Sequence, residues 1–441
     1  MPNATYTFPH NFLWGTATAS HQVEGNNLYS DWWHWEQQPG KIKEGHTSGL
    51  ACDWWGGRYL EDFDRMVAGS QNAHRLSVEW ARIEPTPAFW DEDALDQYRQ
   101  MLLALKARNI QPMVTLCHYC HPQWFLEMGG WQNPQSVAQF ERYARKVVNT
   151  LGDLCDCWLT LNEPNAYVFQ AYMDGNFPPG KKDMNAAFEV GTNLFRAHVS
   201  AYHAIHNLQP GAQVGWALYV LLLDPANPAS WFDQQVTDQQ HRLFNDAWPS
   251  GYVTGEYQTL LKAIPVPQAK GALDWVGLNY YQRQLVRFNP LQPTHLFGER
   301  FSHPQDEKSE TNFISIHPQG LLRVIKWGAQ LGLPMYITEN GVEDSTDRIR
   351  PRFLAQHLRA LWLACMQNYD VRGYFHWTLV DNFEWERGWT QRFGLYALDT
   401  ATQTRTARPS AHMYAKICRE NALSSAVVAE YAPEVLAQLF P

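Results

Sequence analysis

The segment T-L-N-E-P at residues 160–164 places one glutamate, Glu163, directly after a short apolar run and directly before a proline. A second segment, I-T-E-N-G at residues 337–341, places Glu339 at the end of a similar run, just before Asn340 and Gly341. An apolar, β-favouring run that stops at Pro or Gly is typical of a strand that ends in a turn. The two glutamates lie far apart in the chain, so only a fold that gathers strand ends at one rim would bring them together.

Strand-like runs recur along the whole chain and alternate with longer segments of helical periodicity. The eight runs are Phe12 to Thr16, Ala73 to Ser77, Met113 to Leu116, Trp158 to Leu161, Gln213 to Leu218, Trp275 to Leu278, Met335 to Thr338, and Gly373 to Trp377. Between them, apolar residues recur at helical spacing, as at Phe140, Tyr143, Ala144, Val147 and Leu151, and at Leu354, Leu358, Leu361 and Cys365. This alternation predicts an α/β fold, a single (β/α)8 TIM barrel, with both glutamates at the C-terminal ends of strands.

Long loops are expected to form the mouth of this barrel. The stretch from Phe177 to Gly180 contains Pro and Gly, and the stretch from Asn289 to Thr311 is polar, so we predict that both are loops. The chain has no low-complexity tract, short repeat or linker that would divide it. We therefore expect residues 1–441 to form one domain.

Composition excludes several classes of partner. The net charge of −9 argues against binding to nucleic acid or to an anionic membrane surface. The longest apolar run, Trp216 to Leu223, is too short to cross a bilayer, and Met1 to Phe8 lacks the features of a secretion signal. Seven cysteines, an odd number, are more typical of reduced thiols than of a disulfide framework. We therefore expect a cytoplasmic protein.

Paired carboxylates at one rim are what the cleavage of a glycosidic bond requires. One carboxylic acid protonates the departing oxygen, and one carboxylate meets the positive charge that develops on the anomeric carbon. Glu163 and Glu339 are the candidates. A glutamate that follows a strand more often caps the N-terminus of a helix, so the pair alone leaves that alternative open.

Further motifs make the chain resemble glycoside hydrolase family 1. Besides the two glutamate segments, these are F-L-W-G-T-A-T-A-S-H-Q-V-E-G at 12–25, H-R-L-S-V-E-W-A-R at 74–82, V-G-L-N-Y-Y at 276–281 and W-T-L-V-D-N-F-E-W at 377–385. The resemblance runs from about residue 8 to about residue 415. It implies a retaining β-glucosidase or a relative, built as a single (β/α)8 barrel.

The resemblance also implies a role for each matching residue. Glu163 matches the acid/base and Glu339 the nucleophile. Asn162 matches the amide that holds the sugar 2-hydroxyl, while Arg75 and Tyr281 match groups that keep the nucleophile ionised. Because the two carboxyls titrate as a coupled pair, we expect a bell-shaped pH profile.

Six more residues match positions that bind the sugar on the non-reducing side of the scissile bond. They are Gln22, His118, Asn279, Trp377, Glu384 and Trp385. Their amide, imidazole, carboxylate and indole groups suit a neutral polyol. Relatives that act on 6-phosphorylated sugars generally lack the acidic residue at position 384, and Glu384 and Glu386 would repel a phosphate. We therefore expect unphosphorylated β-glycosides.

The chain departs from the common family pattern at three positions. Tyr119 replaces a Trp near the sugar, which leaves the preferred sugar open. Ile314 stands where a Trp often forms a platform for the leaving group, so affinity for flat aromatic leaving groups is in question. Trp389 stands where Tyr or Phe is frequent, and this change predicts nothing further.

A zinc site is the alternative use of Cys117 and Cys120, which are interleaved with His118 and His121. His118 is already assigned to sugar binding, and the chain has no second C-x-x-C or C-x-x-H pair, so we predict no metal. No organic cofactor is required either.

The sequence thus predicts a β-glucosidase-type hydrolase that removes terminal β-D-glucosyl residues and also accepts β-D-galactosyl or β-D-fucosyl residues. Its partner would be a small β-glycoside or an oligosaccharide, and its oligomeric state stays open. One alternative is a transglycosidase or glycosyltransferase on the same barrel, in which an acceptor alcohol replaces water. The other is a glycan-binding protein without activity, which the presence of both glutamates disfavours.

Overall fold

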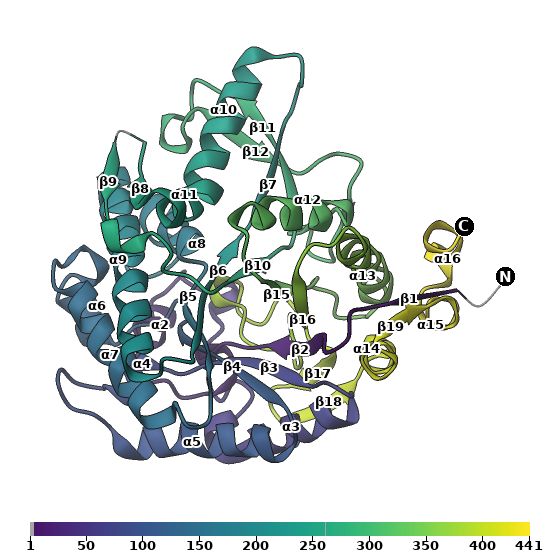
Figure 1. The fold of residues 1–441 in the computed structure, drawn as a ribbon, viewed down its shortest axis with the longest axis horizontal. Helices are drawn as coiled ribbons and strands as arrows, with labels where there is room; N and C mark the ends of the chain where they lie inside the picture. The colour runs from purple at the N-terminus through teal and green to yellow at the C-terminus, as the bar shows by residue number, and fades with distance from the viewer. Residues whose placement is uncertain (1–3, 261) are drawn as a thin grey trace.

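The computed structural model describes residues 4–260 and 262–441, and its centre is a closed barrel of eight parallel strands (Figure 1). In barrel order these are β2 (Leu13–Ala17), β3 (Ala73–Ser77), β4 (Gln111–Cys117), β5 (Cys157–Asn162), β6 (Gln213–Tyr219), β10 (Trp275–Asn279), β15 (Met335–Asn340) and β16 (Val371–His376). All eight predicted runs are confirmed, with ends that differ by at most a few residues. The predicted (β/α)8 architecture is therefore correct.

Helices pack around the outside of the barrel (Figure 1). The longer ones are α3 (Tyr59–Ala68), α5 (Glu92–Ala107), α7 (Ser136–Leu151), α9 (Met184–Leu208), α10 (Trp231–His241), α11 (Ala247–Thr254), α12 (Gln319–Gly328), α13 (Arg350–Met366) and α14 (Pro409–Glu420). Shorter ones are α1 (Ser20–Val23), α2 (Asp31–Glu36), α4 (Trp80–Ile83), α6 (Gln123–Glu127), α8 (Pro164–Val168), α15 (Ser425–Tyr431) and α16 (Leu436–Leu439). The two predicted amphipathic faces lie on α7 and α13 and are buried, because their apolar stripes cover the outer wall of the barrel.

Aromatic side chains fill the space between strands and helices. Trp158 of β5 and Trp275 of β10 are both buried. Trp275 lies beside Gly215 of β6, where a β-carbon would come within 2.4 Å of the indole. Gly215 is therefore needed for the close approach of this ring, and the many tryptophans serve the core as well as the site.

Small accessory sheets surround the barrel. They pair β1 (Thr5–Thr7) with β19 (Ala422–Ser424), β8 (Glu256–Gln258) with β9 (Ala263–Pro265), β13 (Glu307–Lys308) with β14 (Ser315–Ile316), and β17 (Tyr396–Asp399) with β18 (Thr404–Ala407). A further sheet joins β12 (Gly298–Phe301), β11 (Arg283–Phe288) and β7 (Leu222–Pro225). Together with α10 it forms the projection at the top of Figure 1.

One loop prediction is wrong in part. The polar stretch from Asn289 to Thr311 contains β12 and β13, whereas the stretch from Phe177 to Gly180 is a loop as predicted. β12 pairs antiparallel with β11 through backbone hydrogen bonds, which do not require apolar side chains. A polar edge strand of this kind carries little sequence signal.

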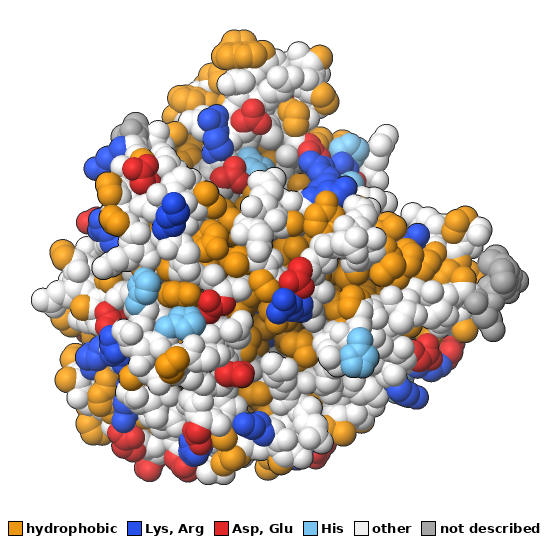
Figure 2. Space-filling view, in the orientation of Figure 1, with side chains coloured by type: hydrophobic (Ala, Val, Ile, Leu, Met, Phe, Trp, Pro, Cys, Tyr) orange, Lys and Arg blue, Asp and Glu red, His pale blue; other side chains and the backbone are white. Residues whose placement is uncertain are grey.

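All seven cysteines lie in the described residues, are buried and form no disulfide, as expected from their odd number. Within residues 4–260 and 262–441, no helix has the length and apolar character needed to cross a membrane. On the face shown in Figure 2, acidic, basic and hydrophobic side chains are interspersed rather than gathered by charge.

Candidate active site

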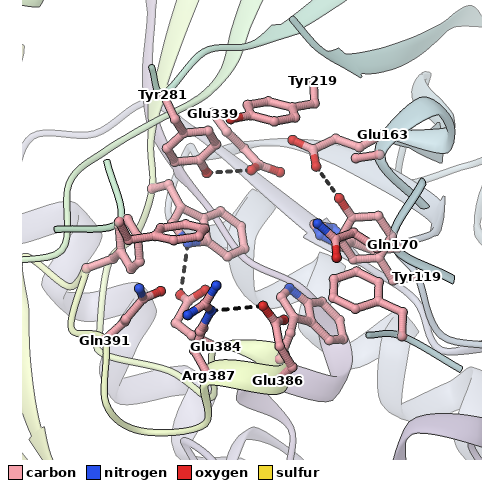
Figure 3. Close-up of a pocket in the computed structure, with 17 residues that line it drawn as sticks. Tyr119, Glu163, Gln170, Tyr219, Tyr281, Glu339, Glu384, Glu386, Arg387 and Gln391 are labelled. Carbon is pink, nitrogen blue, oxygen red and sulfur yellow. Dashed lines mark hydrogen bonds and ion pairs between the residues drawn. The ribbon is translucent and has the colours of Figure 1, made fainter. Parts of the chain in front are cut away.

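Glu163 and Glu339 open into the same cavity at the C-terminal rim of the barrel, which has a volume of about 150 Å³ (Figure 3). Glu339 lies near the end of β15, and Glu163 follows the last residue of β5. Parallel strands of a barrel all end at the same rim, so two residues distant in sequence meet there. The structure thus brings together the pair that the sequence predicted.

Both carboxylate oxygens of Glu339 are held by donors. Nη1 of Arg75 donates to Oε1 at 2.6 Å, and the Tyr281 hydroxyl donates to Oε2 at 2.6 Å. Glu339 is 4% exposed and Arg75 is fully buried, so this ion pair is shielded from water. Burial raises the pKa of Glu339, and Arg75 and Tyr281 oppose that rise because they stabilise the ionised form.

Arg75 also fixes the strands around the pair. Its Nη2 donates to Oδ1 of Asn162 at 2.5 Å, and its Nε donates to Oγ1 of Thr115 at 3.1 Å. One guanidinium therefore links β3 to β4, β5 and β15. Its planar fork suits several acceptors at once, which an ammonium group could not match.

Glu163 is held by two neutral donors instead. Nδ2 of Asn279 donates to Oε1 at 2.7 Å, and the hydroxyl of Tyr119 donates to Oε2. Burial raises the pKa of Glu163 to about 8, with a further contribution from the charge of Glu339, while the hydrogen bonds from Tyr119 and Asn279 lower it. Two identical side chains thus have different environments, and Glu163 is the one that favours a proton.

The side chains of Glu163 and Glu339 do not cap helices, which was the alternative reading of the sequence. Glu163 has left-handed backbone angles, φ 45° and ψ 50°, and precedes α8, but its side chain makes no capping hydrogen bond. Glu339 lies within β15 and precedes no helix directly. Both carboxylates face the cavity instead, as Figure 3 shows.

Four of the six predicted sugar-binding residues line this cavity: His118, Trp377, Glu384 and Trp385. Trp377 donates from Nε1 to Oε1 of Glu384 at 3.0 Å, and Trp385 stacks on His118 with ring centroids 5.8 Å apart. Burial raises the pKa of Glu384 well above its usual range. This wall combines an aromatic surface with polar groups that can exchange hydrogen bonds with hydroxyls.

The other two predicted sugar-binding residues lie behind that wall. Asn279 is fully buried and reaches Glu163, as described above. Gln22 is also fully buried, and its Nε2 donates to the backbone oxygen of Phe383 at 2.8 Å, directly before Glu384. Among the described residues its Oε1 has no hydrogen-bond partner. Gln22 therefore supports the loop that carries Glu384.

Sequence reasoning missed an aromatic residue that lines the cavity, next to the expected platform position. Ile314 is fully buried, whereas the neighbouring Phe313 is 40% exposed and lines the cavity. The Arg387 guanidinium lies 4.7 Å from the centre of the Phe313 ring. Because side chains alternate along an extended segment, a shift of one residue exchanges the buried position and the cavity position. An aromatic residue next to the expected platform position was the available signal.

A second cavity, of about 470 Å³, continues outward from the first and meets it at Gln170, Tyr219 and Phe313. Its lining includes the amides of Gln282, Gln284 and Gln292 and the guanidinium of Arg300. Arg300 lies beside two phenyl rings, at 5.4 Å from Phe169 and 5.5 Å from Phe244, and its Nε donates to Oε1 of Gln240 at 2.6 Å. This groove is polar and mixed in charge.

The histidines near Cys117 and Cys120 are already engaged. Nδ1 of His121 lies 2.9 Å from Asp31, and its Nε2 accepts from Trp131 at 2.8 Å. Nε2 of His118 accepts from Nδ2 of Asn162 at 3.0 Å. Among residues 4–260 and 262–441, no group of three or more His, Cys, Asp or Glu side chains is placed to hold a metal ion.

Comparison with known proteins shows the family of the chain. The family model described as glycosyl hydrolase family 1 matches residues 4–423. A 1,4-β-D-glucan glucohydrolase of Thermotoga neapolitana is 30% identical over 95% of this chain and 99% of its own length. A β-glucosidase of an Agrobacterium species is 32% identical over 93% of this chain and 95% of its own.

Solved structures give the same result. A β-glycosidase from Pyrococcus horikoshii superimposes with a TM-score of 0.91 at 34% identity, over 97% of this chain and 98% of that one. A β-glucosidase from Thermotoga maritima, solved in complex with glucoimidazole, has a TM-score of 0.89 at 30% identity, over 95% of this chain and 100% of that one. The chain therefore belongs to glycosyl hydrolase family 1, as its motifs predicted, and is a glycoside-hydrolysing enzyme.

Proposed function

We propose that the protein is a retaining β-glycosidase that releases terminal non-reducing β-D-glucosyl residues and also accepts β-D-galactosyl or β-D-fucosyl residues. The observation that carries this proposal is the unequal treatment of two carboxyls in one cavity. Burial raises the pKa of both, but an arginine and a tyrosine oppose that rise at Glu339, whereas the charge of Glu339 adds to it at Glu163 and the pKa there reaches about 8. A nucleophile and a general acid need these two states at neutral pH.

In the first step, Glu339 attacks the anomeric carbon while Glu163 gives its proton to the departing oxygen. The C–O bond to the leaving group breaks as the bond from the sugar to Glu339 forms, through an oxocarbenium-like transition state. Arg75 and Tyr281 keep the lone pairs of Glu339 available by holding it ionised. The product of this step is a glycosyl ester on Glu339.

In the second step, Glu163 must act as a base, and the structure offers a reason for the change. The negative charge of Glu339 is one of the causes that raise the pKa of Glu163. Once Glu339 is esterified, that charge is gone, so the pKa of Glu163 falls and the carboxylate can take a proton from water. The water then displaces Glu339 and releases the sugar with its configuration retained.

One wall of the cavity argues for a neutral, unphosphorylated sugar as the substrate. This wall is formed by His118, Trp377, Glu384 and Trp385. A phosphate would add negative charge beside Glu384 and Glu386, and the Arg387 guanidinium, which lines the same cavity, is already paired with Glu386 at 2.9 Å. Two of the proteins named above, from Agrobacterium and from Thermotoga maritima, are β-glucosidases, which supports glucose as the preferred sugar.

The second cavity supports an oligosaccharide leaving group. Its amides and its guanidinium can bind several hydroxyls, and Phe313 at its entrance offers an apolar face to a sugar ring. The same groove would hold an acceptor alcohol, so transfer to an acceptor is the second candidate reaction. Product analysis with added alcohol separates hydrolysis from transfer.

The test of the proposal is incubation with an activated 2-deoxy-2-fluoro-β-glucoside, followed by intact-protein mass measurement and peptide mapping. The fluorine slows both steps, and the activated leaving group lets the ester form faster than it hydrolyses. We expect one fluoroglucosyl unit on the peptide that carries Glu339. No adduct with this reagent or with its galactose analogue, under conditions in which the protein is folded, would contradict the proposed mechanism.

A further inference from the structure

The hydroxyl of Tyr119 donates a hydrogen bond to Oε2 of Glu163, and Figure 3 shows the two side chains pointing toward each other. The residue stands where the family pattern commonly has a tryptophan. An indole N–H can only donate a hydrogen bond, whereas a phenol can both donate and accept. The substitution therefore changes the chemistry next to the acid/base and not only the shape of the pocket.

The backbone places both partners in an unusual conformation. Tyr119 follows β4 with φ 68°, and Glu163 follows β5 with φ 45°, and these two strands are neighbours in the barrel. Residues other than glycine seldom adopt positive φ, and each instance costs on the order of 1 kcal/mol. Two such residues facing each other across adjacent strand ends are typical of a site held in place for function.

Packing holds the Tyr119 ring in place. Phe177 and Trp385 contact it edge-on, each with ring centroids 5.2 Å away, and Tyr167 stacks nearby at 6.4 Å. The residue is only 7% exposed. The phenol oxygen is therefore held at Glu163 rather than free to turn into solvent.

The remaining hydrogen bonds of Glu163 decide which oxygen carries its proton. Asn279 directs Nδ2 to Oε1, and this orientation is fixed because the same Nδ2 also donates to Oδ1 of Asn162 at 3.1 Å, an acceptor that Arg75 holds in place. An amide N–H cannot accept, so the proton of neutral Glu163 lies on Oε2, where the phenol oxygen of Tyr119 can accept it. When Glu163 is ionised, the phenol donates instead.

We propose that Tyr119 is a positioning residue that holds the Glu163 carboxyl through Oε2 in both of its catalytic forms. As acid, Glu163 shares its proton with the phenol until the glycosidic oxygen takes it. As base, Glu163 accepts the phenolic hydrogen, which stabilises the carboxylate that must activate water. This inference rests on the proposed function, because it assigns a partner to the acid/base of that reaction.

The electrostatics agree with this geometry. Burial raises the pKa of Tyr119 well above its usual range, so the phenol keeps its hydrogen at working pH. Its bond to Glu163 lowers the pKa of that carboxyl, against the rise caused by burial and by Glu339. The bond to the ionised form is the stronger of the two, because it is charge-assisted.

The test is Tyr119→Phe, with Tyr167→Phe as the matched control. The control removes the hydroxyl of Tyr167, which belongs to the same aromatic cluster but does not bond to Glu163. We measure the pH dependence of kcat/KM for β-glucosides with good and poor leaving groups. In Tyr119→Phe we expect the basic limb, which reports the ionisation of Glu163, to move to higher pH by about one unit. The same variant should lose about tenfold in kcat/KM for poor leaving groups and far less for dinitrophenyl glucoside.

An unmoved basic limb in Tyr119→Phe, with the same loss for every leaving group, would overturn the assignment and leave the ring as a wall of the pocket. A shift of equal size in Tyr167→Phe would also overturn it. Melting temperatures of the three proteins show whether each is folded. If the unaltered protein hydrolyses no glycoside, the proposed function fails first, which is distinguishable from a failure of the Tyr119 assignment alone.

Discussion

The pocket wall around Glu339 and the wall around Glu163 surround the same type of side chain with neighbours of different charge. A buried guanidinium touches Glu339, and its charge favours the carboxylate. Glu163 accepts hydrogen bonds from an amide and a phenol, and the neighbouring negative charge adds to the rise in pKa that burial causes at both glutamates. The comparison shows that the role of each glutamate follows from the charge of its neighbours rather than from its own chemistry.

Exchanging each glutamate for glutamine gives the largest expected effects and separates the two roles. Glu339→Gln removes the nucleophile, so we expect kcat/KM to fall by about 10⁴-fold or more for every leaving group. Glu163→Gln removes the acid, so we expect a loss of about 10² to 10⁴-fold for poor leaving groups but little change for dinitrophenyl glucoside. Steady-state kinetics across a leaving-group series measures both. If Glu339→Gln instead spared dinitrophenyl glucoside and Glu163→Gln did not, the roles of nucleophile and acid would have to be exchanged.

Removing the guanidinium should make the two walls more alike. Arg75 lowers the pKa of Glu339, so in Arg75→Met the pKa of Glu339 rises and the acid limb of kcat/KM, which requires ionised Glu339, moves to higher pH. We also expect the free energy of unfolding to fall by about 3 to 5 kcal/mol, because a buried carboxylate loses its counter-charge.

Arg350→Met is the control for this effect. Arg350 is also fully buried and ion-paired, with Asp347, and it lies outside the cavity. Its loss should lower the melting temperature without moving the acid limb. If both variants moved the acid limb equally, Arg75 would have no specific role in the ionisation of Glu339.

Much of the fold and of the partners of Glu339 could be predicted from the sequence. The features that could not be predicted depend on local backbone conformation. The eight barrel strands were predictable because strands covered on both sides form continuous apolar runs, as from Val214 to Leu218 in β6. Arg75 and Tyr281 were implied by motifs, and the structure brings both to Glu339. The bond from Tyr119 to Glu163 depends on two left-handed residues, which no periodicity reveals.

The leaving-group side shows the same limit. The sequence showed Ile314 at the position where relatives often have a platform Trp and so put that platform in question, but the structure buries Ile314 and exposes the neighbouring Phe313. The predicted loop from Asn289 to Thr311 contains β12, which borders the second cavity through Arg300. Loop conformation depends on backbone pairing and on local register, and neither follows from composition or hydrophobic spacing.

The smallest expected effect concerns the second cavity. It tests whether binding of the leaving group there is independent of the ionisation of Glu163 and Glu339. Apart from its Nε bond to Gln240, the Arg300 guanidinium makes no hydrogen bond to another described residue, so its amino groups are available to the hydroxyls of a second leaving-group sugar. We expect Arg300→Met to lower the ratio of kcat/KM for a β-linked trisaccharide to that for the disaccharide by about fivefold, or about 1 kcal/mol.

Arg287→Met is the matched control, because Arg287 lies on the adjacent strand β11 with its side chain 58% exposed and paired with Glu299. That variant should keep the ratio of the unaltered enzyme. A ratio unchanged in Arg300→Met would mean that the outer groove contributes no binding energy to a second sugar. The pH dependence of kcat/KM should be the same in both variants as in the unaltered enzyme, because neither arginine touches Glu163 or Glu339. A shifted pH dependence would show that the groove and the catalytic pair are coupled.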